Sequence, residues 1–259
     1  MYYPFPYYME ERVARSIREW IKKGGSFISE AFFGGIQGEN GLHSTTMPGF
    51  GFDEVFGARE GIATTASSFM NAYGREWARE NKDRNLLPMA IGEDMAFIRK
   101  GEEIPGYFFM DELIPFQGKV LASFRDGKAA IVKNRYGKGQ AILIGSLLGY
   151  PYGKMLAPEP ERLIASLVHI CGAVPYMESD DPNVRVDLLK SDDGQYLLVL
   201  VREDEKDSEV EITFQTDIGD MHWVVNLMSH EKFPIENSQG KVRCRIPLKA
   251  SGAEIFALR

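Results

Sequence analysis

Apolar positions recur at helical spacing near the amino terminus. Over residues 10–23, one face collects Val13, Ile17, Trp20 and Ile21, with Ala14 beside them. The pair Gly24-Gly25 follows, and glycine ends a helix because it adopts the left-handed cap conformation at little cost. Residues 2–8 and 26–33 read as strands on either side of this helix. A strand–helix–strand unit predicts a parallel sheet.

The middle of the chain alternates between weak patterns and clear hairpins. A helix is expected over residues 67–79, where aromatic side chains repeat at four-residue spacing. Alternating apolar positions in 120–124 and 129–133 flank the turn Asp126-Gly127, which predicts a hairpin. A second turn over residues 136–139 leads to a buried strand at 141–144. A further helix is expected over residues 159–171, with Leu163, Ile164, Leu167, Val168 and Cys171 on its inner face.

The pattern changes at residues 178–183, a polar stretch with one proline that is typical of a domain boundary. Beyond it, short runs alternate apolar and polar positions with turn signals between them. About six such strands predict an antiparallel β-sandwich. We therefore expect an α/β domain over residues 1–178 and an all-β domain over residues 179–259.

Charge and composition exclude several classes of function. The 259 residues are 44% hydrophobic and carry a net charge of -7, without a cluster of Lys and Arg, so we expect neither nucleic acid nor a membrane as partner. The two cysteines, Cys171 and Cys244, are too few for a disulfide framework or a zinc site. No secretion signal is visible, and a cytoplasmic location is expected.

Three stretches carry a resemblance to a known family. They are residues 20–31, where Gly24-Gly25 precedes a strand ending in Glu30-Ala31; residues 47–60, with Asp53-Glu54-Val55-Phe56-Gly57 and Arg59-Glu60; and residues 124–149. Their order and spacing resemble the trimerisation domain of family 42 glycoside hydrolases, which are β-galactosidase-type enzymes. The last region is similar to the small carboxy-terminal sandwich of that family.

The resemblance implies a fold and a role. The fold would be a class I glutamine-amidotransferase-like (flavodoxin-like) α/β domain, incomplete at its amino terminus, followed by a small antiparallel β-sandwich. The role would be that of a non-catalytic oligomerisation part, a trimer by resemblance, acting with a barrel-bearing chain or portion. The family's catalytic glutamates belong to a TIM barrel that has no counterpart here, so no catalytic, cofactor-binding or metal-binding residue is carried over.

Candidate chemistry is weighed against structural roles. Glu30, at a strand's carboxyl end, and Asp53 with Glu54 in the loop beyond are the acids best placed for glycoside hydrolysis. A role in bonding loop backbone or Arg59 and shaping a subunit contact is favoured for Asp53 and Glu54. An amidotransferase-like fold raises the question of a cysteine nucleophile. Cys171 and Cys244 are not on a strand–helix elbow, so they are interpreted as inert thiols.

The remaining candidates also favour structural roles. The four histidines, His43, His169, His222 and His230, have no metal-ligand spacing, and no cofactor is expected. Gly137 and Gly139 join two strands, so they are read as a turn and not as a phosphate loop. The amino-terminal aromatics are expected at a subunit interface, although they could stack on a sugar; they are Tyr2, Tyr3, Phe5, Tyr7 and Tyr8.

Three functions follow in order of preference. The first is an accessory module of a β-galactosidase-like enzyme that is inactive alone. The second is a stand-alone carbohydrate-binding or regulatory protein derived from that family, with a galactoside or another sugar as ligand. The third is a hydrolase that uses Glu30 with Asp53 or Glu54.

Overall fold

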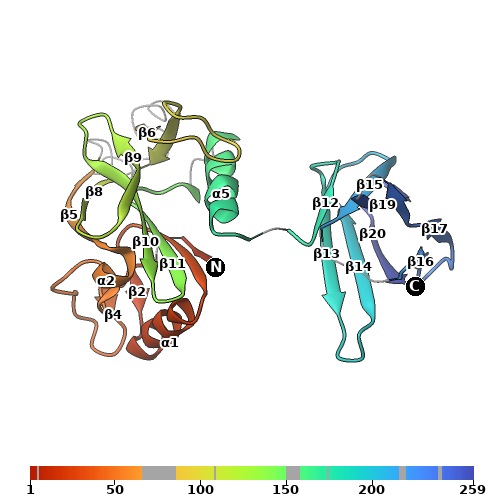
Figure 1. The fold of residues 1–259 in the computed structure, drawn as a ribbon, viewed down its shortest axis with the longest axis horizontal. Helices are drawn as coiled ribbons and strands as arrows, with labels where there is room; N and C mark the ends of the chain where they lie inside the picture. Colours follow the sequence, from red (N-terminus) through yellow and green to blue (C-terminus); the bar gives the residue numbers. More distant parts are fainter. Residues whose placement is uncertain are drawn as a thin grey trace. The chain divides into compact units, whose positions relative to one another are not determined.

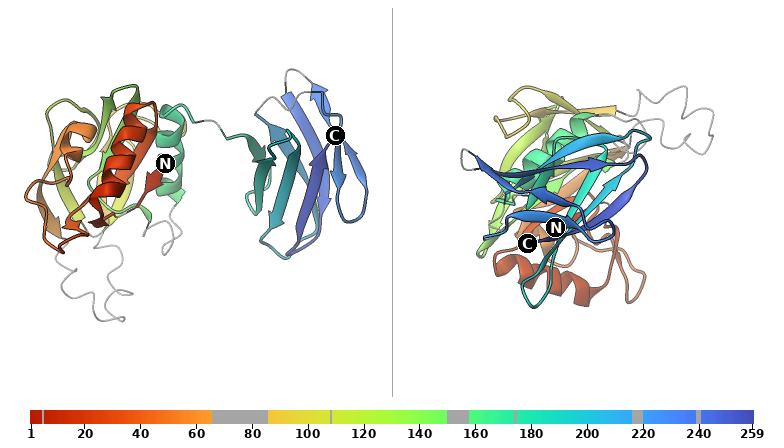
Figure 2. Two further views of the ribbon diagram at one scale, coloured as in Figure 1. Left: turned by 90° about the horizontal axis from the view of Figure 1, so that it is seen from below. Right: turned by 90° about the vertical axis from the view of Figure 1, so that its right-hand side faces the viewer.

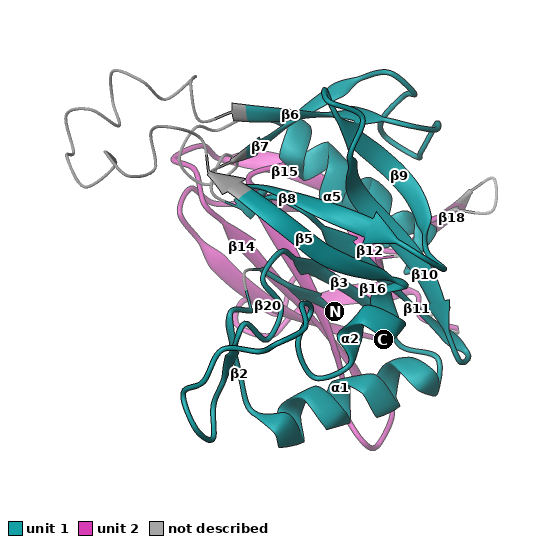
Figure 3. Ribbon diagram, turned by 90° about the vertical axis from the view of Figure 1, so that its left-hand side faces the viewer, with its two compact units in different colours: residues 1–173 teal, residues 174–259 magenta. Residues whose placement is uncertain are grey.

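The computed structural model describes residues 1–4, 6–65, 86–107, 109–149, 158–173, 175–215, 220–238 and 241–259. The chain forms two compact units, Met1–Ala173 and Val174–Arg259 (Figures 1 and 3). Glu178 and Ser179, at the start of the polar stretch noted above, belong to a strand of the second unit. The helix expected over residues 67–79 lies outside the described residues.

The first unit is built on one nine-stranded mixed sheet. Its strand order is β1-β3-β11-β10-β9-β6-β7, with β8 paired to β10 and β5 paired to β8. The strands are β1 (Tyr2–Tyr3), β3 (Ser26–Glu30), β5 (Ala58–Thr65), β6 (Leu86–Ile91), β7 (Glu103–Tyr107), β8 (Phe109–Pro115), β9 (Lys119–Phe124), β10 (Ala129–Tyr136) and β11 (Gly139–Ile144). A small separate pair joins β2 (Tyr8–Met9) to β4 (Ile36–Gln37) in parallel.

The expectation of a parallel α/β sheet is correct for only part of this sheet. Strands β1, β3 and β11 are parallel neighbours, as the strand–helix–strand unit predicts. The other pairings in the sheet are antiparallel. The reason is local, because β9, β10 and β11 are joined by tight turns, and a tight hairpin can only connect antiparallel strands. The described residues are therefore mostly β, and the amidotransferase-like class is not established by this topology.

Helices cover both faces of the sheet. On one face, α1 (Glu11–Lys22) and the short α2 (Phe52–Phe56) pack on a core rich in phenylalanine, with Phe27, Phe33, Phe52 and Phe56 fully buried. On the other face, α5 (Pro158–Ile170) packs through Leu163 and Leu167 on the isoleucines of β3, β10 and β11. The sheet is thus the middle of three layers, which is why its central strands are apolar on both sides.

The buried stripe of α1 differs from the expected one. Ala14, Ile17 and Ile21 are buried, whereas Val13 is 38% and Trp20 is 42% exposed. Buried positions spaced by three and four residues form a narrow stripe, and Val13 and Trp20 lie beside it. Trp20 instead covers Gly25, where a Cβ would lie 2.4 Å from the indole ring.

The second unit consists of two antiparallel sheets with a shared core, as the sequence predicts (Figure 2). One sheet has the order β12-β15-β19-β18 and the other β13-β14-β20-β16-β17. The strands are β12 (Met177–Ser179), β13 (Val184–Lys190), β14 (Tyr196–Arg202), β15 (Ser208–Phe214), β16 (Trp223–Asn226), β17 (Lys232–Pro234), β18 (Glu236–Ser238), β19 (Lys241–Leu248) and β20 (Ala253–Leu258). Residues such as Leu198, Ile212 and Phe256 fill the space between the sheets.

Within the described ranges, no helix combines the length and the apolar character needed to cross a bilayer.

Candidate functional site

Glu30 lies at the carboxyl end of β3, as expected, but it is enclosed by its own unit. Its side chain is 2% exposed. One carboxylate oxygen accepts hydrogen bonds from the Tyr2 hydroxyl at 2.6 Å and from the backbone N–H groups of Leu148 and Gly149 at 2.8 and 3.2 Å. Burial, with Glu30 beside it, raises the pKa of the Tyr2 hydroxyl. Glu30 therefore ties β1 and the segment after β11 to the end of β3, which is a structural role.

Asp53 and Glu54 lie on α2 and do not share the surroundings of Glu30. The Asp53 carboxylate accepts a hydrogen bond from the Arg59 Nε at 3.2 Å, which is the contact expected for its structural role. Glu54 is exposed, and its backbone carbonyl accepts a hydrogen bond from the Asn134 amide. Opposed carboxyl groups across a cleft are the minimum for glycoside hydrolysis. Among the described contacts, the Glu30 and Asp53 carboxylates have separate partners, and no contact joins either of them to the Glu54 carboxylate.

A different pair of acids does meet inside the first unit. The side chains of Glu60 on β5 and Asp111 on β8 are hydrogen bonded to each other. Burial raises the pKa of Asp111 to about 6, and burial together with the Asp111 charge raises the pKa of Glu60. The pair thus retains a proton at a pH where isolated carboxyls are ionised. Sequence patterns missed it because each acid sits in a different strand with no local signal.

Backbone N–H groups hold the Glu60 carboxylate in place, and Asp111 beside it is buried. Glu60 accepts hydrogen bonds from the N–H groups of Phe32 at 2.8 Å and Phe33 at 3.3 Å. Phe32 has a φ of 65°, in the left-handed region that is uncommon for a non-glycine residue. Asp111 is only 1% exposed, so a substrate has no route to its carboxylate. Glu60 consequently fixes the turn after β3, and the pair is a candidate for pH sensitivity.

The cysteines and histidines form no catalytic or metal centre among the described residues. Burial raises the pKa of the Cys171 thiol, and burial raises that of Cys244 to about 12, so neither favours the nucleophilic thiolate. His43 lies 3.4 Å from the Tyr7 hydroxyl, and His169 packs edge-on against Phe97. No group of three or more His, Cys, Asp or Glu side chains in the described parts of the chain is arranged to hold a metal ion.

The amino-terminal aromatics divide between the interior and the surface. Tyr2 bonds Glu30, and Tyr7 packs edge-on against Phe32 with ring centroids 6.1 Å apart. Tyr3 and Tyr8 are 37% and 57% exposed, while Phe5 lies outside the described residues. Gly137 has a φ of 60° in the turn between β10 and β11, and Gly139 begins β11, so the two glycines join two strands, as expected.

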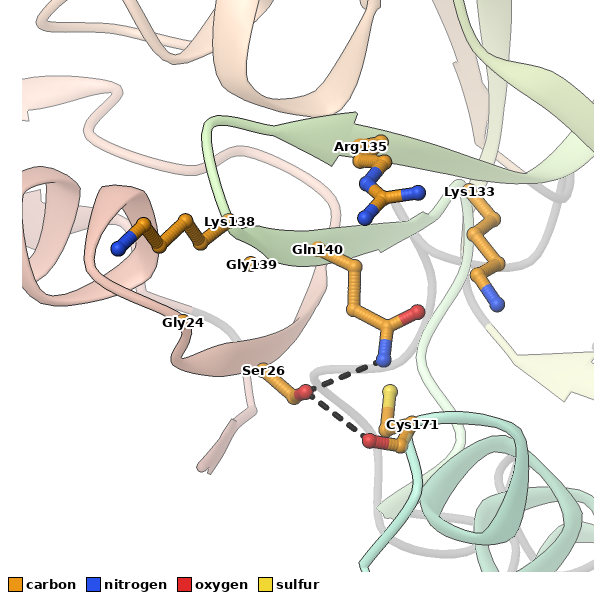
Figure 4. Close-up of a pocket in the computed structure, with 8 residues that line it drawn as sticks. All are labelled: Gly24, Ser26, Lys133, Arg135, Lys138, Gly139, Gln140 and Cys171. Atoms are coloured by element: carbon orange, nitrogen blue, oxygen red, sulfur yellow. Dashed lines mark hydrogen bonds between the residues drawn. The ribbon is translucent and has the colours of Figure 1, made fainter.

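A hollow in the first unit has three basic side chains in its lining (Figure 4). It has a volume of about 460 Å³ and is lined by Gly24, Ser26, Lys133, Arg135, Lys138, Gly139, Gln140 and Cys171. Among the residues that the structure describes, no acidic side chain contributes to this lining. Sequence analysis did not find it, because its cations come from β10 and the following turn, where they are spaced as ordinary exposed strand residues.

Comparison with solved structures shows which fold the chain shares. It is similar to the β-galactosidase from Bacillus circulans sp. alkalophilus, with a TM-score of 0.71 and 18% identity over 100% of this chain and 32% of that one. It is similar to Gan42B, a GH42 β-galactosidase from G. stearothermophilus, with a TM-score of 0.69 to its E323A catalytic mutant and 15% identity, covering 100% and 31%. The α-L-fucosidase isoenzyme 2 from Paenibacillus thiaminolyticus gives a TM-score of 0.64 and 13% identity, covering 100% and 40%.

The chain thus spans about a third of the length of the β-galactosidases it matches. No family model and no curated protein sequence matches it. The likeness shows a fold shared with part of these glycoside hydrolases. The match covers this chain over both units.

Proposed function

We propose that this chain is the non-catalytic oligomerisation and accessory portion of a β-galactosidase-like glycoside hydrolase. The observation that carries the proposal is the match over 100% of this chain to about a third of GH42 β-galactosidases. A second observation supports it: the Glu30 and Asp53 carboxylates are engaged in separate structural contacts. The catalytic acids then belong to another part of the enzyme, carried by the same polypeptide or by a partner chain.

We also propose a finer assignment of the two units. The first unit is a divergent relative of the amidotransferase-like trimerisation domain, with β1, β3 and β11 as its parallel part. The second unit is the counterpart of the carboxy-terminal sandwich. Side chains exposed near the amino terminus, such as Tyr8 and Trp20, support an interface in this region, since exposed aromatics are enriched at subunit contacts. A cytoplasmic location is consistent with two free cysteines.

Light scattering on the purified chain tests the oligomerisation role. The expected mass is three times that of one chain. A matched variant, Trp20→Ser, is expected to lower the trimer fraction without unfolding, because Trp20 is 42% exposed and lies outside the buried stripe of α1. A chain that stays monomeric at all concentrations would overturn the oligomerisation role.

Calorimetric titration separates this proposal from the stand-alone alternative. The accessory role predicts no saturable heat with galactosides or β-glucans. Saturable binding of such a neutral sugar by a monomeric chain would instead favour a carbohydrate-binding protein derived from the family.

A further inference from the structure

The hollow lined by Lys133, Arg135 and Lys138 is the basic hollow. It lies on the sheet face that α5 covers, next to the carboxyl end of that helix. On this face, Ile28, Ile142 and Ile131 are buried in the core that α5 covers. The next row at the sheet end is polar: Arg135 on β10 pairs with Gln140 on β11, which pairs with Ser26 on β3. The three side chains share a face because residues paired across neighbouring strands point the same way, and residues two apart along each strand continue that face to the buried isoleucines. Helix α5 ends at Ile170, so this last row is left open.

The floor of the hollow is ordered by hydrogen bonds. The Gln140 amide donates to the Ser26 hydroxyl at 3.2 Å, and Ser26 donates to the Cys171 carbonyl at 3.1 Å. Lys133 donates to the Ile170 carbonyl at 3.3 Å. These contacts join β3, β10 and β11 to the end of α5 and to Cys171 beyond it, so the hollow has a defined shape before any ligand enters.

The cations of the hollow are not neutralised by acids. Among the described residues, no carboxylate lies within ion-pair distance of Lys133, Arg135 or Lys138. Lys133 uses one of its three donors on Ile170, and the Arg135 guanidinium offers five. In Figure 4 the side chains of Lys133 and Arg135 extend to the side where Gln140 lies, while Lys138 points away at the rim.

A second hollow shares residues with the basic hollow, and the two can be compared as sites for an anion. It has a volume of about 340 Å³ and shares Lys133 and Arg135, but its lining includes Glu93, which is paired with Lys119. An anion entering there would meet a carboxylate. The acid-free hollow is therefore the better place for negative charge.

We propose that this hollow binds a small phosphomonoester, with the phosphate on Arg135 and Lys133 and the attached body over Gln140 and Ser26. A planar guanidinium can hold two phosphate oxygens at once, and an ammonium adds a point charge. The volume of about 460 Å³ falls within the roughly 300–1,000 Å³ of small-molecule sites. This allows a monosaccharide-sized body beside the phosphate. This proposed phosphomonoester site does not depend on the proposed accessory function of the chain.

Calorimetric titration of the full chain with galactose 6-phosphate tests this site, with galactose and inorganic phosphate as comparison ligands. Saturable binding of the sugar phosphate is expected, tighter than that of either comparison ligand. Arg135→Gln should weaken it by about tenfold or more, since a charge-assisted bidentate contact is lost. Arg185→Gln removes the same charge in the second unit, where Arg185 is exposed and pairs with Asp187, and should leave the affinity unchanged.

A thermal melt and a far-ultraviolet dichroism spectrum show that each variant is folded. Absence of binding at millimolar sugar phosphate would overturn the proposal. Equal affinity in the Arg135→Gln variant and the unmodified chain would do the same, as would galactose or inorganic phosphate binding as tightly as the sugar phosphate.

Discussion

Replacing Asp111 by asparagine should change how the stability of the first unit depends on pH. Asp111 is 1% exposed, and one of its carboxylate oxygens has no hydrogen-bond partner among the described residues. Its neighbour Glu60 is hydrogen bonded to it and also has a raised pKa. An asparagine at 111 keeps the shape, carries no charge, and can donate its amide hydrogens to Glu60. The substitution therefore removes the cost of ionising two buried carboxyls side by side.

The sign and size of the change in the free energy of unfolding with pH follow from proton linkage. Burial raises the pKa of Asp111 from its ordinary 3.8 to about 6 in the folded chain. Between these values the folded state binds more protons than the unfolded state, so the free energy of unfolding falls as pH rises. A difference of about 2 pH units corresponds to a loss of ~3 kcal/mol, complete above pH 6. The raised pKa of Glu60 extends the decline to higher pH.

Denaturant unfolding measured from pH 4 to pH 8 checks this expectation. Asp111→Asn should be more stable than the unmodified chain at pH 8, by on the order of 3 kcal/mol, and the gain should vanish towards pH 4. Glu161→Gln, which neutralises an exposed acid on α5, serves as the control and should track the unmodified chain. The reasoning is refuted if the difference between Asp111→Asn and the unmodified chain is the same at both ends of the pH range.

Three further substitutions test the packing of the two units. In Gly139→Ala, the new Cβ would lie 2.1 Å from the Ile21 carbonyl oxygen, so thermal melts should show a loss of about 1–3 kcal/mol or more. Asn134→Asp replaces an amide that donates to the Val55 carbonyl at 3.1 Å by a carboxylate, and chemical denaturation should show a loss of about 1–3 kcal/mol. Arg202→Gln breaks a buried ion pair with Asp181, and scanning calorimetry should show a lower Tm for the second unit alone.

The sequence predicts the elements whose signals are local. Helix α1 and helix α5 combine a 3.6-residue apolar repeat with glycine at or just beyond their ends, and both form within one residue of the expected bounds. The hairpin at Asp126-Gly127 is also confirmed, because its turn chemistry and flanking alternation agree. The antiparallel sheets of the second unit follow from the same kind of signal.

Long-range pairing is what the sequence could not supply. Strands β5 and β8 pair with a register shift between Glu60 and Ala63. No local pattern in either strand identifies the other as its partner. The sequence therefore did not predict the Glu60–Asp111 pair. It also did not predict the row of Arg135, Gln140 and Ser26, because these residues come from separate strands. Local periodicity fixes which face of a strand is buried, whereas the neighbours of that strand depend on the whole sheet.

The central proposal is that this chain forms a non-catalytic portion of a glycoside hydrolase. The most direct test is steady-state hydrolysis of a nitrophenyl β-galactoside by the purified chain. We predict no turnover above the buffer blank, with Glu30→Gln and Glu54→Gln indistinguishable from the unmodified chain. Enzyme-like turnover that disappears in either variant would contradict the account.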